Sequence, residues 1–280
     1  MPGKLYVVAT PLGNLEDISL RAIQILQDVD LIACEDTRHT GKLLNRFSIS
    51  TKTSCYYDHN EEQKTRELMR LLTEEKQVAL VSDAGTPLVS DPGFLLVRAC
   101  RERGIPVYPI PGASAAVGAL SVSGLPTDCF FFQGFLPRQK AAQKTRLRQL
   151  GSWGVTLVIY LSPHGLLDTL RNTLNVLGNR RVFLIREMTK IHETHYAGRL
   201  REILEILERE KIRGEFTVVI EGKAPQVNSK SSVKNFDVLA YVAGLKELYG
   251  LSEVDAIKRV SKEFDLSRRE VYQTVQESKN

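Results

Sequence analysis

The sequence lacks the short motifs that identify several large classes of protein. None of its four cysteines (Cys34, Cys55, Cys100 and Cys129) forms a Cys-x-x-Cys metal or redox pair. Its 19 glycines include no Gly-x-Gly triplet, which excludes the dinucleotide-binding fingerprint. Neither Gly-Lys-Ser/Thr nor Gly-x-Ser-x-Gly occurs, which excludes a P-loop and the nucleophile elbow of the α/β-hydrolases.

Long apolar runs are also missing. Runs such as Val155–Leu161 are far shorter than the roughly 20 residues that cross a bilayer. The segment Met1–Asn14 lacks the longer apolar region and the cleavage site of a signal peptide. Scattered cysteines in a chain of this length are typical of small buried side chains in a reducing compartment. We therefore expect a cytoplasmic protein.

The composition is that of an ordinary globular protein. The 280 residues are 42% hydrophobic and 25% charged. This length predicts roughly two domains. The 38 basic and 33 acidic residues leave a net charge of +5, which permits an anionic partner such as nucleic acid without requiring one.

Short apolar runs alternate with helical patterns along residues 1–125. Strands are predicted at 5–9, 31–34, 78–81 and 107–110, and helices at 19–29, 60–75, 94–103 and 114–122. This alternation predicts an α/β domain with a parallel sheet covered by helices. Ligands of such sheets bind at loops beyond the strand carboxyl ends. These loops are Thr10–Asn14, Glu35–Thr40, Ser82–Gly93 and Pro111–Ser114.

Residues 126–223 repeat the alternation and predict a second α/β domain. The expected strands are 129–133, 156–161, 181–187 and 215–221, and the expected helices are 138–150, 166–177 and 200–210. Residues 224–235 are rich in Pro, Gln, Asn, Ser and Lys and predict a linker.

Residues 236–280 predict a small helical appendage. Helices are expected at 237–249, 253–264 and 268–277, and the last two resemble a helix-turn-helix. Its basic residues could face phosphates or form a solvated helix face. They are Lys258, Arg259, Lys262, Arg268 and Arg269.

The predicted strand ends carry polar clusters that allow two interpretations. Asp83 could accept a hydrogen bond from a ligand or belong to a rigid turn. The cluster Glu35–Thr40 could contact substrate or begin a helix capped by Asp36 or Thr37. Asp58–Glu61 is similar, with Asn60 as a possible cap.

His192 and His195 stand three residues apart, a spacing that could supply metal ligands. The surrounding segment is neither apolar nor periodic, and no carboxylate has a matching spacing. We therefore favour a polar loop over a metal site.

Longer motifs occur in a fixed order along the chain. They are Ala9–Leu15, Cys34–Gly41, Asp58–Glu61, Val81–Gly93, Pro111–Gly112, Ser123–Pro126, Gly134–Pro137 and Gly214–Gly222. Together these motifs, which span residues 4–223, resemble the tetrapyrrole methylase superfamily and, within it, the subfamily that methylates small-subunit ribosomal RNA.

The resemblance implies an α/β, two-domain class III methyltransferase fold with a mostly parallel first sheet and a small C-terminal helical appendage. It also implies S-adenosylmethionine as methyl donor, no metal, a homodimer, and 2′-O-methylation of a cytidine in 16S rRNA. The donor-lining residues implied by position are Leu12, Asp83, Gly85, Thr86, Ser114 and Ala115, with Leu161 near the adenine. The sequence departs from the subfamily at Leu161 and Gly165, where an acid and a base are usual.

Transfer to a ribose hydroxyl requires that a proton be removed, which favours a general base. Asp36 and Glu35 are the candidates, with Arg38 or His59 orienting a group or holding phosphate. Arg138 and Lys140, followed by Lys144, Arg146 and Arg148, could contact RNA or form a solvated helix face.

Two other functions stay open at this point. One is a class III methyltransferase that acts on a tetrapyrrole or another small molecule. The other is a non-catalytic nucleic-acid-binding protein built around the C-terminal helices. The basic tail argues against the first, and the loops at the strand ends argue against the second.

Overall fold

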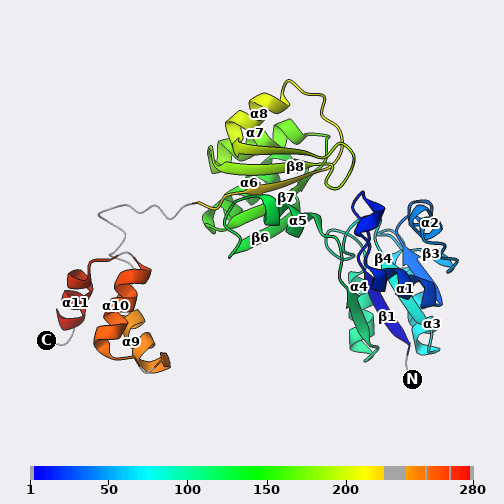
Figure 1. The fold of residues 1–280 in the computed structure, drawn as a ribbon, viewed down its shortest axis with the longest axis horizontal. Helices are drawn as coiled ribbons and strands as arrows, with labels where there is room; N and C mark the ends of the chain where they lie inside the picture. The colour runs from blue at the N-terminus through cyan, green and yellow to red at the C-terminus, as the bar shows by residue number, and fades with distance from the viewer. Residues whose placement is uncertain (1–2, 224–237, 250, 265, 278–280) are drawn as a thin grey trace. The chain divides into compact units, whose positions relative to one another are not determined.

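The computed structural model describes residues 3–223, 238–249, 251–264 and 266–277. The chain divides into two compact units, Met1–Ala224 and Pro225–Asn280. The first unit contains two sheets, and the described residues of the second form helices (Figure 1). The predicted linker, residues 224–235, lies outside the described residues.

The first sheet has five strands, all parallel, in the order β3-β2-β4-β1-β5. The strands are β1 (Lys4–Val8), β2 (Leu31–Cys34), β3 (Thr53–Cys55), β4 (Gln77–Val81) and β5 (Val107–Ile110). The connecting helices are α1 (Leu20–Asp28), α2 (Thr37–Arg46), α3 (Glu61–Thr73) and α4 (Phe94–Glu102), and a 3-10 turn η1 covers Leu15–Asp17. The prediction of a parallel first sheet is confirmed.

Helices cover both faces of this sheet. Leu26 of α1 and Leu43 of α2 pack with Ile32 on one face. Leu72 of α3 and Leu96 of α4 pack on the other face. Because both faces are buried, the strands consist almost entirely of apolar residues, and ligands can reach the sheet only at its edges and strand ends.

The second sheet is mixed, in the order β6-β7-β10-β8-β9. β6 and β7 are parallel, whereas β7–β10, β10–β8 and β8–β9 are antiparallel. The strands are β6 (Phe130–Phe135), β7 (Thr156–Leu161), β8 (Arg181–Arg186), β9 (Thr194–Arg199) and β10 (Phe216–Ile220). The helices are α5 (Ala115–Val122), α6 (Lys140–Ser152), α7 (Leu166–Leu177) and α8 (Leu200–Leu207).

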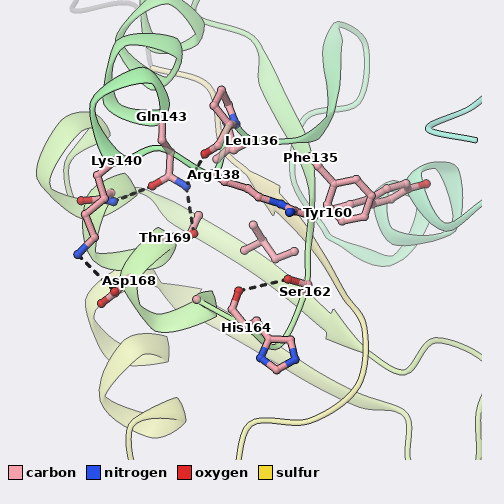
Figure 2. Close-up of a pocket in the computed structure, with 14 residues that line it drawn as sticks. Phe135, Leu136, Arg138, Lys140, Gln143, Tyr160, Ser162, His164, Asp168 and Thr169 are labelled. Atoms are coloured by element: carbon pink, nitrogen blue, oxygen red, sulfur yellow. Dashed lines mark hydrogen bonds and ion pairs between the residues drawn. The ribbon is translucent and has the colours of Figure 1, made fainter. Parts of the chain in front are cut away.

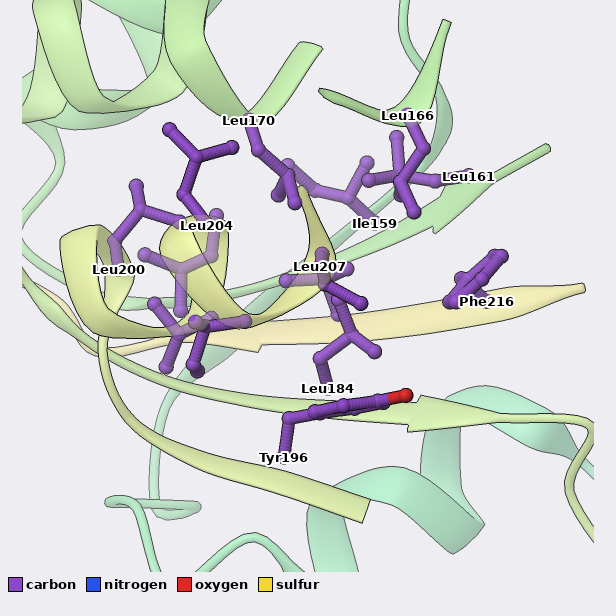
Figure 3. Packing of buried hydrophobic residues seen from close by; sticks show 14 of the residues in the cluster. Ile159, Leu161, Leu166, Leu170, Leu184, Tyr196, Leu200, Leu204, Leu207 and Phe216 are labelled. Carbon is purple, nitrogen blue, oxygen red and sulfur yellow. The ribbon is translucent and has the colours of Figure 1, made fainter. Parts of the chain in front are cut away.

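The second sheet is also covered on both faces. One face carries a leucine-rich core that includes Leu170 of α7 and Leu204 of α8 (Figure 3). Helix α6 contributes Leu147 to the same core. The other face packs against α5 through Ala116 and Leu120. Helix α5 follows β5 of the first sheet in the chain but contacts β7, β8 and β10 of the second.

The described residues of the second unit form three helices around a core of their own. The helices are α9 (Val238–Tyr249), α10 (Glu253–Glu263) and α11 (Arg268–Glu277). Val242, Val260 and Val271 bring the three helices together. None of the helices in the described ranges has the length and apolar character needed to cross a membrane.

The structure contains β3, β9 and the 3-10 turn η1, which the sequence patterns did not predict, and α2, which was one of the two interpretations of the Glu35–Thr40 cluster. The interpretation of the His192–His195 segment as a polar loop is wrong at its second histidine, because His195 lies within β9. β9 is an edge strand in which only Tyr196 is buried, so it lacks the apolar alternation that indicates a strand.

Candidate functional site

The polar loops predicted as the ligand site all lie at the carboxyl ends of the strands of the first sheet, which form one edge of that sheet. They follow β1, β2, β4 and β5, and the Asp58–Glu61 segment follows β3. In a parallel sheet these carboxyl ends share one edge. The five strands therefore bring together segments that are up to about 100 residues apart in the sequence.

Backbone hydrogen bonds join the loops after β1 and β4. Thr10 and Gly85 exchange two of them, with N···O distances of 2.8 and 2.9 Å. The Thr10 hydroxyl also donates to the Ser82 carbonyl over 3.0 Å. Gly85 has a φ of +84°, and a Cβ there would lie 3.3 Å from the Leu12 side chain. This position therefore requires glycine.

Two further contacts bring in the loops after β2 and β5. The backbone N–H of Asp36 donates to the Asp83 carboxylate over 3.1 Å. The Thr86 hydroxyl donates to the Ala113 carbonyl over 3.1 Å. Ser114 precedes α5 and makes no side-chain capping hydrogen bond. Of the residues predicted to line the methyl donor, Leu12, Asp83, Gly85, Thr86 and Ser114 thus lie along connected loops, and Ala115 begins α5.

Asp36 begins helix α2, as one of the two interpretations of its cluster predicts. Its Oδ1 accepts the N–H of Arg38 over 2.8 Å, and its Oδ2 pairs with the Arg38 guanidinium at 2.9 Å. The bonds from Arg38 lower the pKa of Asp36 to about 2. The carboxylate therefore stays ionised and attracts protons only weakly at neutral pH.

Glu35 has the opposite electrostatic environment. Burial raises its pKa, and the charges of Asp83, Asp58 and Asp36 add to the rise. Asp91 behaves in the same way: burial, followed by the charge of Glu35, raises its pKa to about 6. This part of the edge is acidic and holds carboxyl groups that attract protons more strongly than usual.

Asp91 was not predicted as a site residue, although its loop was. The signal was a second Asp in the Ser82–Gly93 loop, but its burial cannot be derived from the sequence. Asp58 and His59 are exposed in the segment that follows β3. Glu61 has a structural role, because its Oε1 accepts the N–H groups of Gly93 and Leu95 at the start of α4.

Leu161, Arg138 and Lys140 lie elsewhere, in a pocket of about 500 Å³ in the second sheet (Figure 2). The pocket is formed by the carboxyl ends of β6 and β7 and the first turns of α6 and α7. Sequence reasoning assigned Leu161 to the donor and the two basic residues to RNA. The structure groups these three residues in one cavity.

Within the described residues, no group of three or more His, Cys, Asp or Glu side chains is placed to hold a metal ion. His195 instead contacts Glu193, with 2.7 Å between Nε2 and Oε1.

Residues 4–204 match the family model of the tetrapyrrole (corrin/porphyrin) methylases. The chain has two sheets covered by helices and a candidate site at the strand ends of the first sheet. Together with this match, these features define its class: the chain belongs to the tetrapyrrole methylase family.

Its relatives within the family carry a more specific name. The chain is 45% identical over 277 residues to ribosomal RNA small subunit methyltransferase I of Halalkalibacterium halodurans, covering 96% of this chain and 93% of that protein. It is 48% identical over 227 residues to the protein of that name from Escherichia coli O157:H7, covering 80% and 79%. The protein of that name from Thermotoga maritima is 46% identical over 221 residues, covering 79% of this chain and 99% of that protein.

Solved structures agree on the fold. Cobalt precorrin-4 methyltransferase, a cobalamin biosynthetic enzyme, matches with a TM-score of 0.58 at 15% identity, covering 78% of this chain and 94% of that one. Uroporphyrin-III-C-methyltransferase from Thermus thermophilus matches with a TM-score of 0.55 at 24% identity, with the same coverages. The prediction of a class III methyltransferase fold is confirmed.

Proposed function

We propose that the chain transfers a methyl group from S-adenosylmethionine to the 2′-hydroxyl of a cytidine in 16S ribosomal RNA, in the cytoplasm and as a homodimer. The observation that carries the proposal is the gathering of the motif-bearing loops at one edge of the first sheet. The names of the relatives support an rRNA substrate. Residues 1–125 and 126–223 are proposed as the two halves that form the donor cleft.

The donor site is assigned to the first-sheet edge, with Leu12, Asp83, Gly85, Thr86, Ser114 and Ala115 as its residues. The residues present fit this ligand. Glu35, Asp83 and Asp91 would supply negative charge to a positively charged donor at this site, and the glycine at position 85 would permit close backbone approach. S-adenosylmethionine supplies a methyl group on a positively charged sulfur, which is already an activated leaving group.

The remaining task is to remove a proton from the ribose hydroxyl. Of the two candidates, Glu35 suits this role better, because its raised pKa brings it nearer to the working pH. Asp36 fits a positioning role, since Arg38 binds it and α2 begins on it. Arg38, whose side chain is 89% exposed, and the exposed His59 are then available to hold RNA phosphate.

The experiment is transfer of a tritiated methyl group from S-adenosylmethionine to small ribosomal subunits, to naked 16S rRNA and to porphyrinoid substrates. We expect label in RNA, with mass spectrometry placing it on a ribose. Label in a porphyrinoid alone would support the rival small-molecule reaction. An unchanged pattern of rRNA methylation in a deletion strain would contradict the proposal.

A further inference from the structure

The pocket of the second sheet combines three kinds of surface in one cavity. Its volume of about 500 Å³ can hold one nucleotide. Figure 2 shows Gln143 and Thr169 on one side and Phe135 with Tyr160 on another, with Arg138 and Lys140 also in the lining. Each surface matches a different part of a nucleotide.

The first surface is a wall of amides. Asn172 donates to Gln143 Oε1 over 2.6 Å, and Gln143 donates to the Thr169 hydroxyl over 3.2 Å. Gln143 and Asn172 are only 7% and 8% exposed, so the wall is fixed by packing. Gln143 also donates to the Pro137 carbonyl over 3.4 Å, so both of its N–H groups are used within the protein. The wall therefore presents chiefly oxygen acceptors, which suit the amino groups on the edge of a base.

The second surface is aromatic. The rings of Phe135 and Tyr160 meet edge to face, with centroids 5.8 Å apart. Phe135 is 57% exposed at the end of β6. An exposed ring beside a polar wall can stack on an unpaired base, an interaction that every base can make.

The third surface carries positive charge. Within the described parts of the chain, no acidic residue pairs with Arg138, and Lys140 lies 3.5 Å from Asp168. Arg171 binds Asp168 at 3.1 Å and Glu208 at 2.8 Å, so Lys140 and Arg171 together balance these two carboxylates and Arg138 supplies the excess positive charge. Helices α6 and α7 start at this rim without side-chain caps, so their first N–H groups and dipoles favour an anion.

These charges favour RNA over the methyl donor as the occupant. S-adenosylmethionine has no phosphate and carries a positive sulfur, whereas each RNA nucleotide brings a phosphate. The pocket also adjoins the acidic loop of the first sheet, because a Cβ on Gly134 of β6 would lie 2.7 Å from the Ser90 hydroxyl.

We propose that this pocket binds one unpaired nucleotide of the RNA substrate, with its base against Phe135 and the amide wall and its phosphate at Arg138 and Lys140. The proposal rests on the proposed function and adds to it a separate site for RNA. Leu161, which lines the pocket, then contacts the RNA base.

The test compares Arg138→Ala and Lys140→Ala with Arg209→Ala, which removes an equal charge from an exposed position outside the pocket. Affinity for a 16S rRNA fragment is measured at several salt concentrations, and affinity for S-adenosylmethionine is measured by calorimetry. We expect each pocket variant to bind RNA about 10-fold more weakly, with a slope of log K against log salt smaller by about 0.7. Donor affinity should stay within about 2-fold of wild type, because no donor atom enters the pocket in this proposal.

A stacking variant provides a second readout. Phe135→Ala should weaken RNA binding by about 5-fold or more. Phe135→Trp keeps an aromatic ring and should bind RNA as tightly as the wild type does. Loss of donor binding in the pocket variants would overturn the proposal and assign the cavity to the donor. Effects equal to those of Arg209→Ala would overturn it as well. In both cases the wild-type chain would still methylate RNA, whereas wild-type protein that binds the donor but no RNA would refute the proposed function too.

Discussion

Glu35 and Asp36 are adjacent in the sequence yet differ in their affinity for a proton. Burial among other carboxylates raises the pKa of Glu35, whereas hydrogen bonds from Arg38 lower that of Asp36 to about 2. The difference arises because β2 ends at Cys34, so that Glu35 turns toward the loops and Asp36 starts a helix.

We therefore predict that Glu35→Gln lowers the rate of methyl transfer more than Asp36→Asn does. Removing a general base costs between about 100-fold and 10,000-fold in rate. Asn is itself a good N-cap, so Asp36→Asn keeps the start of α2 while losing the ion pair with Arg38. The measurement is single-turnover transfer at saturating donor; a slower Asp36→Asn than Glu35→Gln would assign the base to Asp36.

Asp91 gives a prediction for stability against pH. Its pKa is raised to about 6 in the folded chain, mainly by burial, so the folded state holds its proton more tightly than the unfolded state does. The free energy of unfolding should therefore fall as pH rises from about 4 to about 6 and then level off. Asp91→Asn should remove this loss and raise the free energy of unfolding at pH 7 by about 1 kcal/mol, allowing for the partial exposure of the carboxyl.

Urea unfolding of both proteins at pH 4 and pH 7 measures the effect of Asp91. The two curves should differ less at pH 4, where the carboxyl is protonated in the folded state and only partly ionised in the unfolded state. A variant that is less stable than wild type at pH 7 would show that hydrogen bonding to Asp91, such as that from Ser82, outweighs its burial.

The pocket of the second sheet contains two polar residues whose burial could not be predicted from the sequence. Gln143 and Asn172 lie in helices that were predicted, but a polar residue on a helix is normally assigned to solvent. Both are buried because α6 and α7 pack side by side and pair their amides with each other. Such a contact between helices cannot be derived from periodicity, whereas Arg138 and Lys140 were identified by charge alone.

At the scale of elements, prediction depended on how much apolar surface each element buries. Helix α1 was predicted with its cap, and Ser19 Oγ accepts the Ala22 N–H over 3.1 Å. Helix α2 was only one of two interpretations of its cluster, because the residues that it buries are limited to Thr40, Leu43 and Leu44. β3 was missed because it is a short edge strand without a fully buried residue.

The prediction at the scale of elements concerns Gly85, in the loop after β4. Gly85→Val should reduce donor affinity, because the φ of +84° strains a β-branched residue and its Cβ would meet Leu12. The strain costs about 1–3 kcal/mol of stability. Calorimetry with S-adenosylmethionine measures the loss of donor affinity.

Gly104→Val is the matched control for that experiment. Its φ is +68°, and it has no neighbouring atom within 4 Å of the added Cβ. It should cost similar stability while leaving donor affinity unchanged. Equal donor affinity in the two variants would remove Gly85 from the proposed donor site.

At the scale of the whole chain, all residues proposed to take part in methyl transfer lie in the first unit, and none lies in the second. The second unit has its own core, with Val242, Val260 and Val271 inside. The Thermotoga maritima relative is covered over 99% of its length by an alignment that spans 79% of this chain. About a fifth of the present chain therefore has no counterpart there.

We predict that a chain ending at residue 224 binds S-adenosylmethionine as the full chain does and binds RNA more weakly. The second unit carries the basic residues Lys258, Arg259, Lys262, Arg268 and Arg269, which suit phosphate contacts. Electrophoretic mobility shift with 16S rRNA, alongside donor calorimetry, measures both. Unchanged RNA affinity at physiological salt would mean that these side chains form a solvated face.

The paired hydrogen bonds between Thr10 and Gly85 have a consequence for motion. Loop amides normally exchange their hydrogens with solvent quickly, but these two are held by reciprocal bonds of 2.8 and 2.9 Å. They should exchange almost as slowly as the strands that they follow. Because the loops after β1 and β4 are already ordered, they lose little conformational entropy when a ligand binds. More of the free energy of the contacts is then retained as affinity.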